Sequence, residues 1–119
     1  MNLVIDIGNT AVKVYLFKNN EIFKKEVLNE NNLIHSLKSF PINDISNIIC
    51  SSVTKSYKDQ LSEIFKKSNY YDFSDNKLKL PFKNNYETKT LGQDRIGLIS
   101  SAVMKFKDQN SLVIDIGTC

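Results

Sequence analysis

Two identical stretches of this sequence place an acidic residue and a glycine at the end of an apolar run. The stretch Leu3-Val4-Ile5-Asp6-Ile7-Gly8 returns letter for letter as Leu112-Val113-Ile114-Asp115-Ile116-Gly117, and Thr10 and Thr118 follow the two copies closely. Small residues after a strand leave backbone N–H groups free to approach an anion. A carboxylate beside such a turn suits a hydrated cation such as Mg²⁺, lying between the carboxylate and a phosphate. The repeat therefore predicts two similar half-sites for a phosphorylated ligand.

A single copy of this motif also has a plainer interpretation, a buried strand followed by a polar hairpin. The repeat favours phosphate binding, because the second copy comes about one small domain after the first. It begins at Leu112 in a chain of 119 residues, which leaves no room for a domain behind it. We therefore expect residues 1–110 to form one domain and residues 111–119 to be the first strand of a truncated second domain. A site shared by both copies would be incomplete in this chain.

Composition argues against several classes of function. The net charge is +3, and the lysines are scattered among acidic residues, so the sequence does not suggest nucleic-acid binding. Cys50 and Cys119 are the only cysteines, without a C-x-x-C motif or clustered histidines, which argues against a zinc site and fits a reduced cytoplasmic protein. The sequence opens without a basic leader or a long apolar stretch, so we expect neither secretion nor a membrane span.

The spacing of apolar residues predicts an α/β domain with the element order βββαβαβα. We expect strands at 3–5, 12–17, 21–28, 45–50 and 70–73, and helices at 33–40, 57–65 and 91–106. The first three strands can pair as an antiparallel meander with a turn at Asn19-Asn20, and the later strands favour parallel crossovers. The last helix should bury Ile96, Ile99, Ala102, Val103 and Phe106 on one face. Residues 76–90 lack a period and predict a loop.

This order, followed by a second copy of the first strand, is typical of a duplicated ribonuclease-H-like domain, the first of two actin-like ATPase domains. Three motifs carry a more specific resemblance: Asp6-Ile7-Gly8-Asn9-Thr10, Leu91-Gly92-Gln93-Asp94-Arg95 and Asp115-Ile116-Gly117-Thr118. In order and spacing they resemble the type III pantothenate kinases of the actin/hexokinase/Hsp70 superfamily. The resemblance runs the whole length of the chain, and Tyr86 shortly before the middle motif adds to it.

The resemblance implies phosphorylation of pantothenate by ATP, the first step toward coenzyme A. The first ATP-phosphate loop would comprise Asp6, Ile7, Gly8, Asn9, Thr10, Ala11, Val12 and Lys13. In it Asp6 would hold Mg²⁺ through water and Lys13 would neutralise phosphate charge, although Lys13 could instead be an ordinary solvated strand residue. By the same resemblance Thr118 would meet ATP, and Asp115 would ligate a monovalent cation, K⁺ or NH₄⁺.

The middle motif would bind pantothenate, with Asp94 as the general base for its primary hydroxyl. Asp94 could instead only stabilise the dipole of the helix that starts there. Arg95 is a two-pronged donor suited to the carboxylate of pantothenate, and Tyr86 offers a hydroxyl; either could also be structural. Gln93, where alanine is common in the family, would contribute only its backbone.

The family further implies a homodimer, and we expect the 119 residues alone to be inactive. Two other functions stay open on this sequence. One is a nucleotide-binding regulator, like the accessory transcription factors that resemble these kinases; the other is a sugar or acetate kinase of the same superfamily. The presence of both Asp94 and Arg95 favours the pantothenate kinase.

Overall fold

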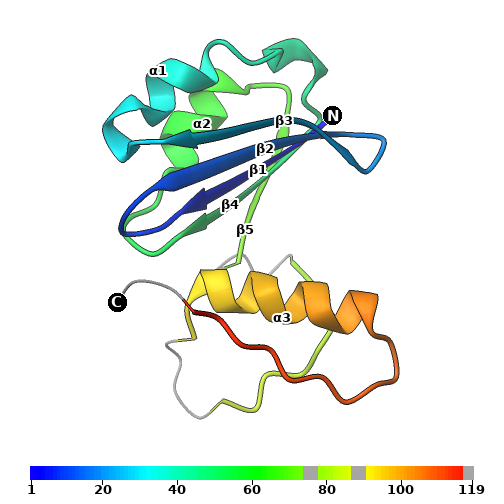
Figure 1. The fold of residues 1–119 in the computed structure, drawn as a ribbon. Coiled ribbons are helices and arrows are strands. Elements are labelled where there is room, and N and C mark those ends of the chain that lie inside the picture. Colours follow the sequence, from blue (N-terminus) through cyan, green and yellow to red (C-terminus); the bar gives the residue numbers. More distant parts are fainter. Residues whose placement is uncertain (74–77, 87–90, 117–119) are drawn as a thin grey trace.

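The computed structural model describes residues 1–73, 78–86 and 91–116 (Figure 1). Its elements follow the order predicted from the sequence, βββαβαβα. They are β1 (Asn2–Ile7), β2 (Val12–Lys18), β3 (Glu21–Leu28), α1 (Leu33–Leu37), β4 (Asn47–Ser52), α2 (Lys58–Ile64), β5 (Asn69–Asp72) and α3 (Gln93–Lys105). Two short 3-10 helices, η1 (Glu30–Asn32) and η2 (Ile42–Asp44), flank α1.

The strands form one mixed sheet with the order β3-β2-β1-β4-β5. The meander is confirmed, because β1 pairs antiparallel with β2 and β2 antiparallel with β3. Its tight hairpin uses Asn19 and Asn20 with φ of 52° and 65°, a left-handed conformation that asparagine tolerates better than most residues. The predicted crossovers are confirmed as well, since β4 runs parallel to β1 and β5 parallel to β4. The carboxyl ends of β1, β4 and β5 therefore lie at one edge of the sheet.

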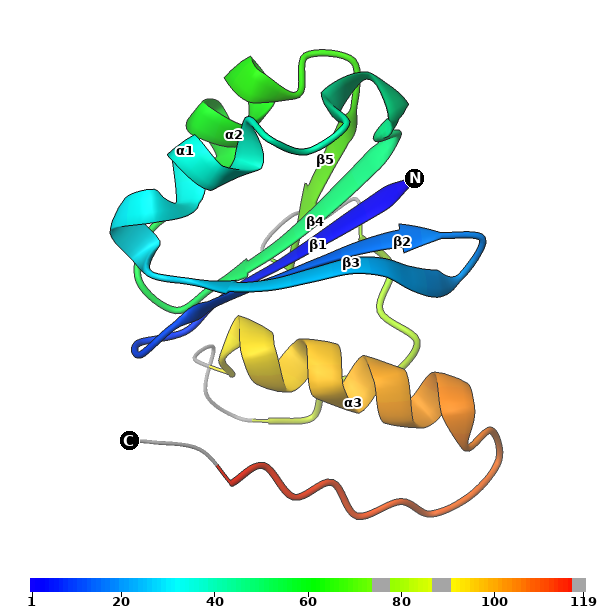
Figure 2. The ribbon, with the colours of Figure 1, turned by 45° about the horizontal axis from the view of Figure 1, so that its top comes forward.

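Helices cover both faces of the sheet, with α1 and α2 on one side and α3 on the other (Figures 1 and 2). In β1 and β2 alternate residues are buried and form a core on the side of α1 and α2. This core contains Leu3, Ile5, Ile7, Val12, Val14, Leu16, Leu33, Leu37, Phe40, Ile45, Ile48, Cys50, Tyr57, Leu61 and Phe65, all buried. The remaining strand residues project toward α3 or toward solvent. No described helix is long and apolar enough to cross a membrane.

The last helix is less buried than its periodicity predicted. Ile96, Ile99, Ala102 and Val103 are half-buried, and Phe106, just beyond the end of α3, is 45% exposed. The predicted face is therefore the more protected one, but Phe106 is wrongly assigned to the buried set. The physical reason is that α3 makes its main strand contacts with β4, which leaves much of its apolar face partly uncovered.

The second copy of the acid-glycine motif does not form the predicted strand in the part that is described. Residues 110–116 belong to no helix or strand and run back along α3 on the side away from the sheet (Figure 2). Leu112, Ile114 and Ile116 are 86%, 70% and 93% exposed. A strand needs a hydrogen-bonding neighbour, and none of the described strands pairs with this segment. Residues 117–119 lie outside the described part, and the domain boundary after residue 110 stays a prediction.

Candidate active site

A tight turn joins β1 to β2 at the predicted phosphate loop. The backbone N–H of Gly8 donates to the carbonyl oxygen of Ala11 at 3.1 Å and closes the turn. Ile7 and Val12, on either side, are fully buried in the core, whereas residues 9–10 are exposed. The turn is thus anchored at both ends and open at its tip. Because the side chains of Ile7 and Val12 point into the core, only their backbones can meet a ligand.

Three polar residues of neighbouring strands lie in one row beside this turn. Asp6 of β1 is in register with Lys13 of β2 on one side and with Ser51 of β4 on the other. Residues in register share a face of a sheet, and here it is the face opposite the core, because Ile5 and Ile7 are the buried neighbours of Asp6. Asp6 is half-buried and Lys13 exposed. The row therefore presents a carboxylate beside an ammonium group on the side of the sheet that α3 covers.

The start of α3 is tied to the end of β4. The side-chain oxygen Oε1 of Gln93 accepts a hydrogen bond from the backbone N–H of Ser52 at 3.2 Å. The side chain of Gln93 therefore has a structural contact, which joins the helix to the strand next to Asp6, and the expectation that Gln93 offers a substrate only its backbone stays a prediction. The two residues are 41 positions apart, and no periodicity in the sequence indicates this contact.

The carboxylate of Asp94 folds back over Gly92, the residue just before its helix. Its Oδ1 accepts the backbone N–H of Arg95 at 2.8 Å, and a Cβ added to Gly92 would lie 2.4 Å from the same oxygen. A side chain at position 92 would therefore displace this carboxylate, whereas the backbone angles of Gly92, φ −56° and ψ 145°, are open to other residues. Asp94 and Arg95 are both exposed in the first turn of α3. Their charged groups are accessible to a ligand.

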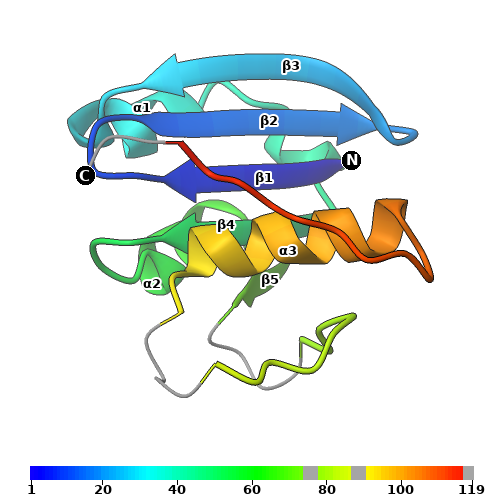
Figure 3. The same cartoon turned by 60° about the horizontal axis from the view of Figure 1, so that its bottom comes forward.

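The two motifs thereby meet at one edge of the sheet. The first turn of α3 lies at the carboxyl ends of β1 and β4, where the β1–β2 turn also lies (Figure 3). In open α/β sheets, ligands bind in the crevice outside the carboxyl ends of the strands. Ser52 pairs with Ile7 of the first motif and bonds to Gln93 of the second, so the two motifs are neighbours in space. A cavity of about 250 Å³ opens near the end of β4, and its lining includes Ser52, Tyr57 and Gln93 but neither Asp6 nor Asp94.

The remaining predicted residues lie in segments outside the sheet and α3. Tyr86 is 57% exposed in the segment 78–86, where its backbone N–H donates to Oδ1 of Asn84 at 2.9 Å. Asp115 is exposed in the segment behind α3, and the described residues contain no cluster of three histidine, cysteine or acidic side chains that could hold a metal ion. Gly117 and Thr118 lie outside the described residues, so the meeting of the two glycine turns stays a prediction.

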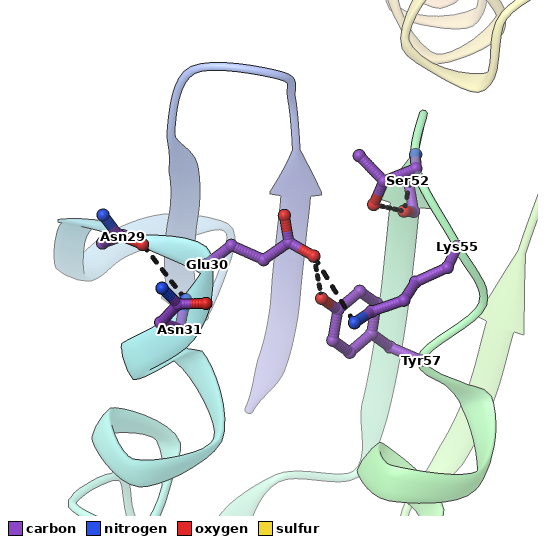
Figure 4. A network of polar contacts seen from close by, with 7 residues as sticks. Asn29, Glu30, Asn31, Ser52, Lys55 and Tyr57 are labelled. Atoms are coloured by element: carbon purple, nitrogen blue, oxygen red, sulfur yellow. Dashed lines mark hydrogen bonds and ion pairs between the residues drawn. The ribbon is translucent and has the colours of Figure 1, made fainter.

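A polar network that the sequence did not reveal fixes the loop between β4 and α2 (Figure 4). Tyr57 is only 4% exposed, and its hydroxyl donates to Oε1 of Glu30. Nζ of Lys55 lies 3.8 Å from the same carboxylate oxygen and 5.1 Å from the centre of the Tyr57 ring. Burial, together with the bond to Glu30, raises the pKa of Tyr57 to about 12. The network joins η1 to a wall of the cavity, because Lys55 and Tyr57 also line it.

We expect replacement of Tyr57 with Phe to lower the free energy of unfolding by about 1–2 kcal/mol, since a hydrogen bond to a charged group is lost while the ring stays packed. The phenol of Tyr57 keeps its proton to higher pH in the folded chain than in the unfolded one. Its contribution to stability is therefore present below the unfolded pKa of about 10 and is lost as the pH rises toward 12.

Urea unfolding of the intact protein at several pH values measures both effects. Wild type should lose stability between pH 10 and 12 more steeply than the Phe variant. Tyr86→Phe serves as the matched control, because this tyrosine is 57% exposed. Equal stability of wild type and Tyr57→Phe at neutral pH would show that the hydroxyl does not bind Glu30 in solution.

Comparison with known proteins points to one family. A model of the type III pantothenate kinase family matches residues 2–119. The chain is 43% identical over 124 aligned residues to a type III pantothenate kinase of Christiangramia forsetii, covering 100% of this chain and 50% of the relative. It is 37% identical to one of Flavobacterium psychrophilum and 36% identical to one of Bacteroides fragilis, with 100% of this chain covered in both. The chain spans about half the length of the curated relatives it matches.

Proposed function

The chain belongs to the type III pantothenate kinase family, and on this premise we propose that the protein containing it transfers the γ-phosphoryl group of ATP to pantothenate. The product would be 4'-phosphopantothenate, in the first step of coenzyme A biosynthesis. One observation above all supports the proposal: the β1–β2 turn with Asp6 and the start of α3 with Asp94 lie at the same edge of the sheet, joined through Gln93 and Ser52.

The β1–β2 turn is the proposed site for the phosphates of ATP. The tip of the turn at residues 9–10 is exposed to an approaching anion, and Lys13 offers a positive charge beside Asp6. The site also suits Mg²⁺, which binds through one or two carboxylates together with waters and phosphate oxygens. Asp6 supplies one carboxylate, and the neighbouring Ser51 hydroxyl is buried without a hydrogen-bond partner among the described residues. A bound Mg²⁺ would neutralise the charge of the phosphates.

Asp94 is the proposed general base. Its carboxylate takes the proton of the primary hydroxyl of pantothenate as that oxygen attacks the γ-phosphorus, and the bond from the γ-phosphorus to the bridging oxygen breaks to release ADP. Exposure of Asp94 at the start of α3 supports this role, because a base must come within hydrogen-bond reach of the hydroxyl. Arg95, its exposed neighbour, is proposed to hold the carboxylate of pantothenate, with Tyr86 completing the site.

We also propose a fold assignment, roles for residues beyond this site and an assembly. We assign the fold to a ribonuclease-H-like domain, the first of two actin-like ATPase domains, on the support of the element order and the mixed sheet. Thr118 would meet ATP, Asp115 would ligate K⁺ or NH₄⁺, and the active protein would be a cytoplasmic homodimer. A second domain beginning at residue 111 would complete the site, so the 119 residues alone should not turn over.

The test is ADP formation by the full-length protein with ATP, Mg²⁺, K⁺ and pantothenate. We expect turnover that depends on pantothenate, with 4'-phosphopantothenate identified by mass spectrometry. Acetate, glycerol and glucose are the control acceptors and should give no turnover above the ATP-only background. Nucleotide binding without turnover would contradict the kinase proposal and would fit a nucleotide-binding regulator.

A further inference from the structure

Ser51 carries the buried polar atom of the described structure that has no hydrogen-bond partner. The residue is only 8% exposed and sits in β4 among residues that form regular ladders. A buried hydroxyl without a partner costs free energy, since it has given up water and gained nothing in return. Such an atom calls for an explanation, and a bound water or ion is one that its place beside Asp6 allows.

The position of Ser51 shows which partner that can be. The residue is in register with Asp6, and neighbouring strands lie about 4.8 Å apart, so one small oxygen ligand can touch both side chains. The next residue, Ser52, donates its N–H to Gln93 at the start of α3. The Ser51 hydroxyl therefore belongs to the same sheet face as the Asp6 carboxylate, the face that α3 covers.

We propose that the Ser51 hydroxyl accepts a hydrogen bond from a water of the Mg²⁺ hydration shell and donates its own proton to the Asp6 carboxylate. This inference rests on the proposed function, which places MgATP at Asp6. A water bound to Mg²⁺ has its lone pair engaged by the metal and acts as a donor, so it needs acceptors around it. A serine hydroxyl can accept from that water and donate to the carboxylate at the same time. Ser51 is thus a positioning residue for the hydrated ion.

The variant Ser51→Ala distinguishes this role from a packing role, because the two roles predict different changes in the unfolding temperature and in the Kd for MgATP. In the nucleotide-free protein, the hydroxyl has no partner to lose, so the midpoint of thermal unfolding should stay the same or rise. In the complex, one hydrogen bond to the hydrated ion is lost, and the Kd for MgATP should rise roughly tenfold. The Kd for ATP in excess EDTA should stay within about twofold, because the bond exists only when the ion is present.

The experiment is calorimetric titration of ATP into the intact protein, once with excess Mg²⁺ and once with EDTA, for wild type and both serine variants. Ser68→Ala is the matched control. Its hydroxyl donates to the carbonyl oxygen of Ile45 at 2.6 Å, before the amino end of β4 and thus at the edge of the sheet opposite the β1–β2 turn. We expect Ser68→Ala to lower the unfolding temperature and to leave both Kd values unchanged.

Three results would overturn the inference. An unchanged Kd for MgATP in Ser51→Ala would remove the contact. Equal weakening with Mg²⁺ and with EDTA would show that the hydroxyl touches the nucleotide itself and not the hydrated ion. A lower unfolding temperature with unchanged Kd would make Ser51 a packing residue. A wild-type protein that binds no MgATP would instead reject the proposed function, and this result is separate from the other three.

Discussion

Replacement of Asp94 with Asn is expected to lower kcat for pantothenate phosphorylation by roughly 10²–10⁴-fold in the full-length protein, while the Kd for MgATP stays the same. The amide keeps the size and the hydrogen-bonding oxygen of the side chain but cannot accept a proton at neutral pH. The hydroxyl of pantothenate would then attack the γ-phosphorus without a base. Nucleotide binding should be spared, because the proposed phosphate site is at Asp6 and the β1–β2 turn. Steady-state kinetics and calorimetric titration measure the two quantities.

The chain offers a control for the alternative that Asp94 only stabilises its helix. Asp59 also lies in the first turn of a helix, α2, and is exposed. If both residues act only on the helix dipole, Asp59→Asn and Asp94→Asn should each cost about 0.3–1 kcal/mol of unfolding free energy and leave kcat alone. We expect that pattern for Asp59→Asn alone. Unchanged turnover in Asp94→Asn would show that the general base lies elsewhere.

The sheet could be predicted because its signal is local. In β2 the aliphatic residues Val12, Val14 and Leu16 occupy every second position, and this period of two indicates which face enters the core without reference to the rest of the chain. The hairpin at Asn19-Asn20 is equally local, since it depends on residue types that accept positive φ. Strand order and direction then follow from short meander connections and helical crossovers.

The parts that could not be predicted depend on partners far away in the sequence. The burial of Phe106 depends on what covers the second half of α3, and a helical period says which face is apolar but not how much of it is covered. The apolar run at 112–116 reads as a strand by composition, yet a strand also needs a neighbour to pair with. The same motif therefore forms β1 at one end of the chain and an exposed segment at the other.

The candidate site, too, was predictable only in part. Motifs identified Asp6, Lys13 and Asp94 as residue types fit for phosphoryl transfer, and the register of the sheet gives a reason why Asp6 and Lys13 are neighbours. The contacts around these groups could not be predicted from the sequence. The packing of α3 on β4 produces the bond between Gln93 and Ser52, and it leaves the Ser51 hydroxyl without a hydrogen-bond partner among the described residues. No spacing of residues in the sequence specifies this packing.

Gly92→Ala is expected to lower kcat by roughly 10²-fold without unfolding the protein, because a displacement of about 1 Å at a reacting group can cost that much. The backbone of Gly92, with φ −56° and ψ 145°, accepts alanine. The new Cβ, however, would lie 2.4 Å from Oδ1 of Asp94, so this flexible carboxylate must rotate away and give up the N–H of Arg95. The KM for ATP should change little, since the β1–β2 turn is untouched.

Gly97→Ala is the matched control, in the same helix. There the added Cβ would lie 3.2 Å from Cζ of Phe73, so a ring must shift slightly but Asp94 is not involved. Alanine inside a helix is favoured over glycine by about 1 kcal/mol, so this variant should unfold at the same or a higher temperature and keep its turnover within about twofold. A similar loss of kcat in both variants would mean that any added methyl group disturbs α3.

The double variant Gly92→Ala/Asp94→Asn decides whether Gly92 acts through Asp94. If the methyl group slows the reaction only by displacing the base, it has nothing left to displace once the carboxylate is replaced, and the double variant should be no slower than Asp94→Asn alone. Additive losses would instead place Gly92 in direct contact with pantothenate through its backbone. The kinetic cycle therefore tests the one geometric relation on which the assignment of the base depends, the position of the Asp94 carboxylate over the glycine that opens its helix.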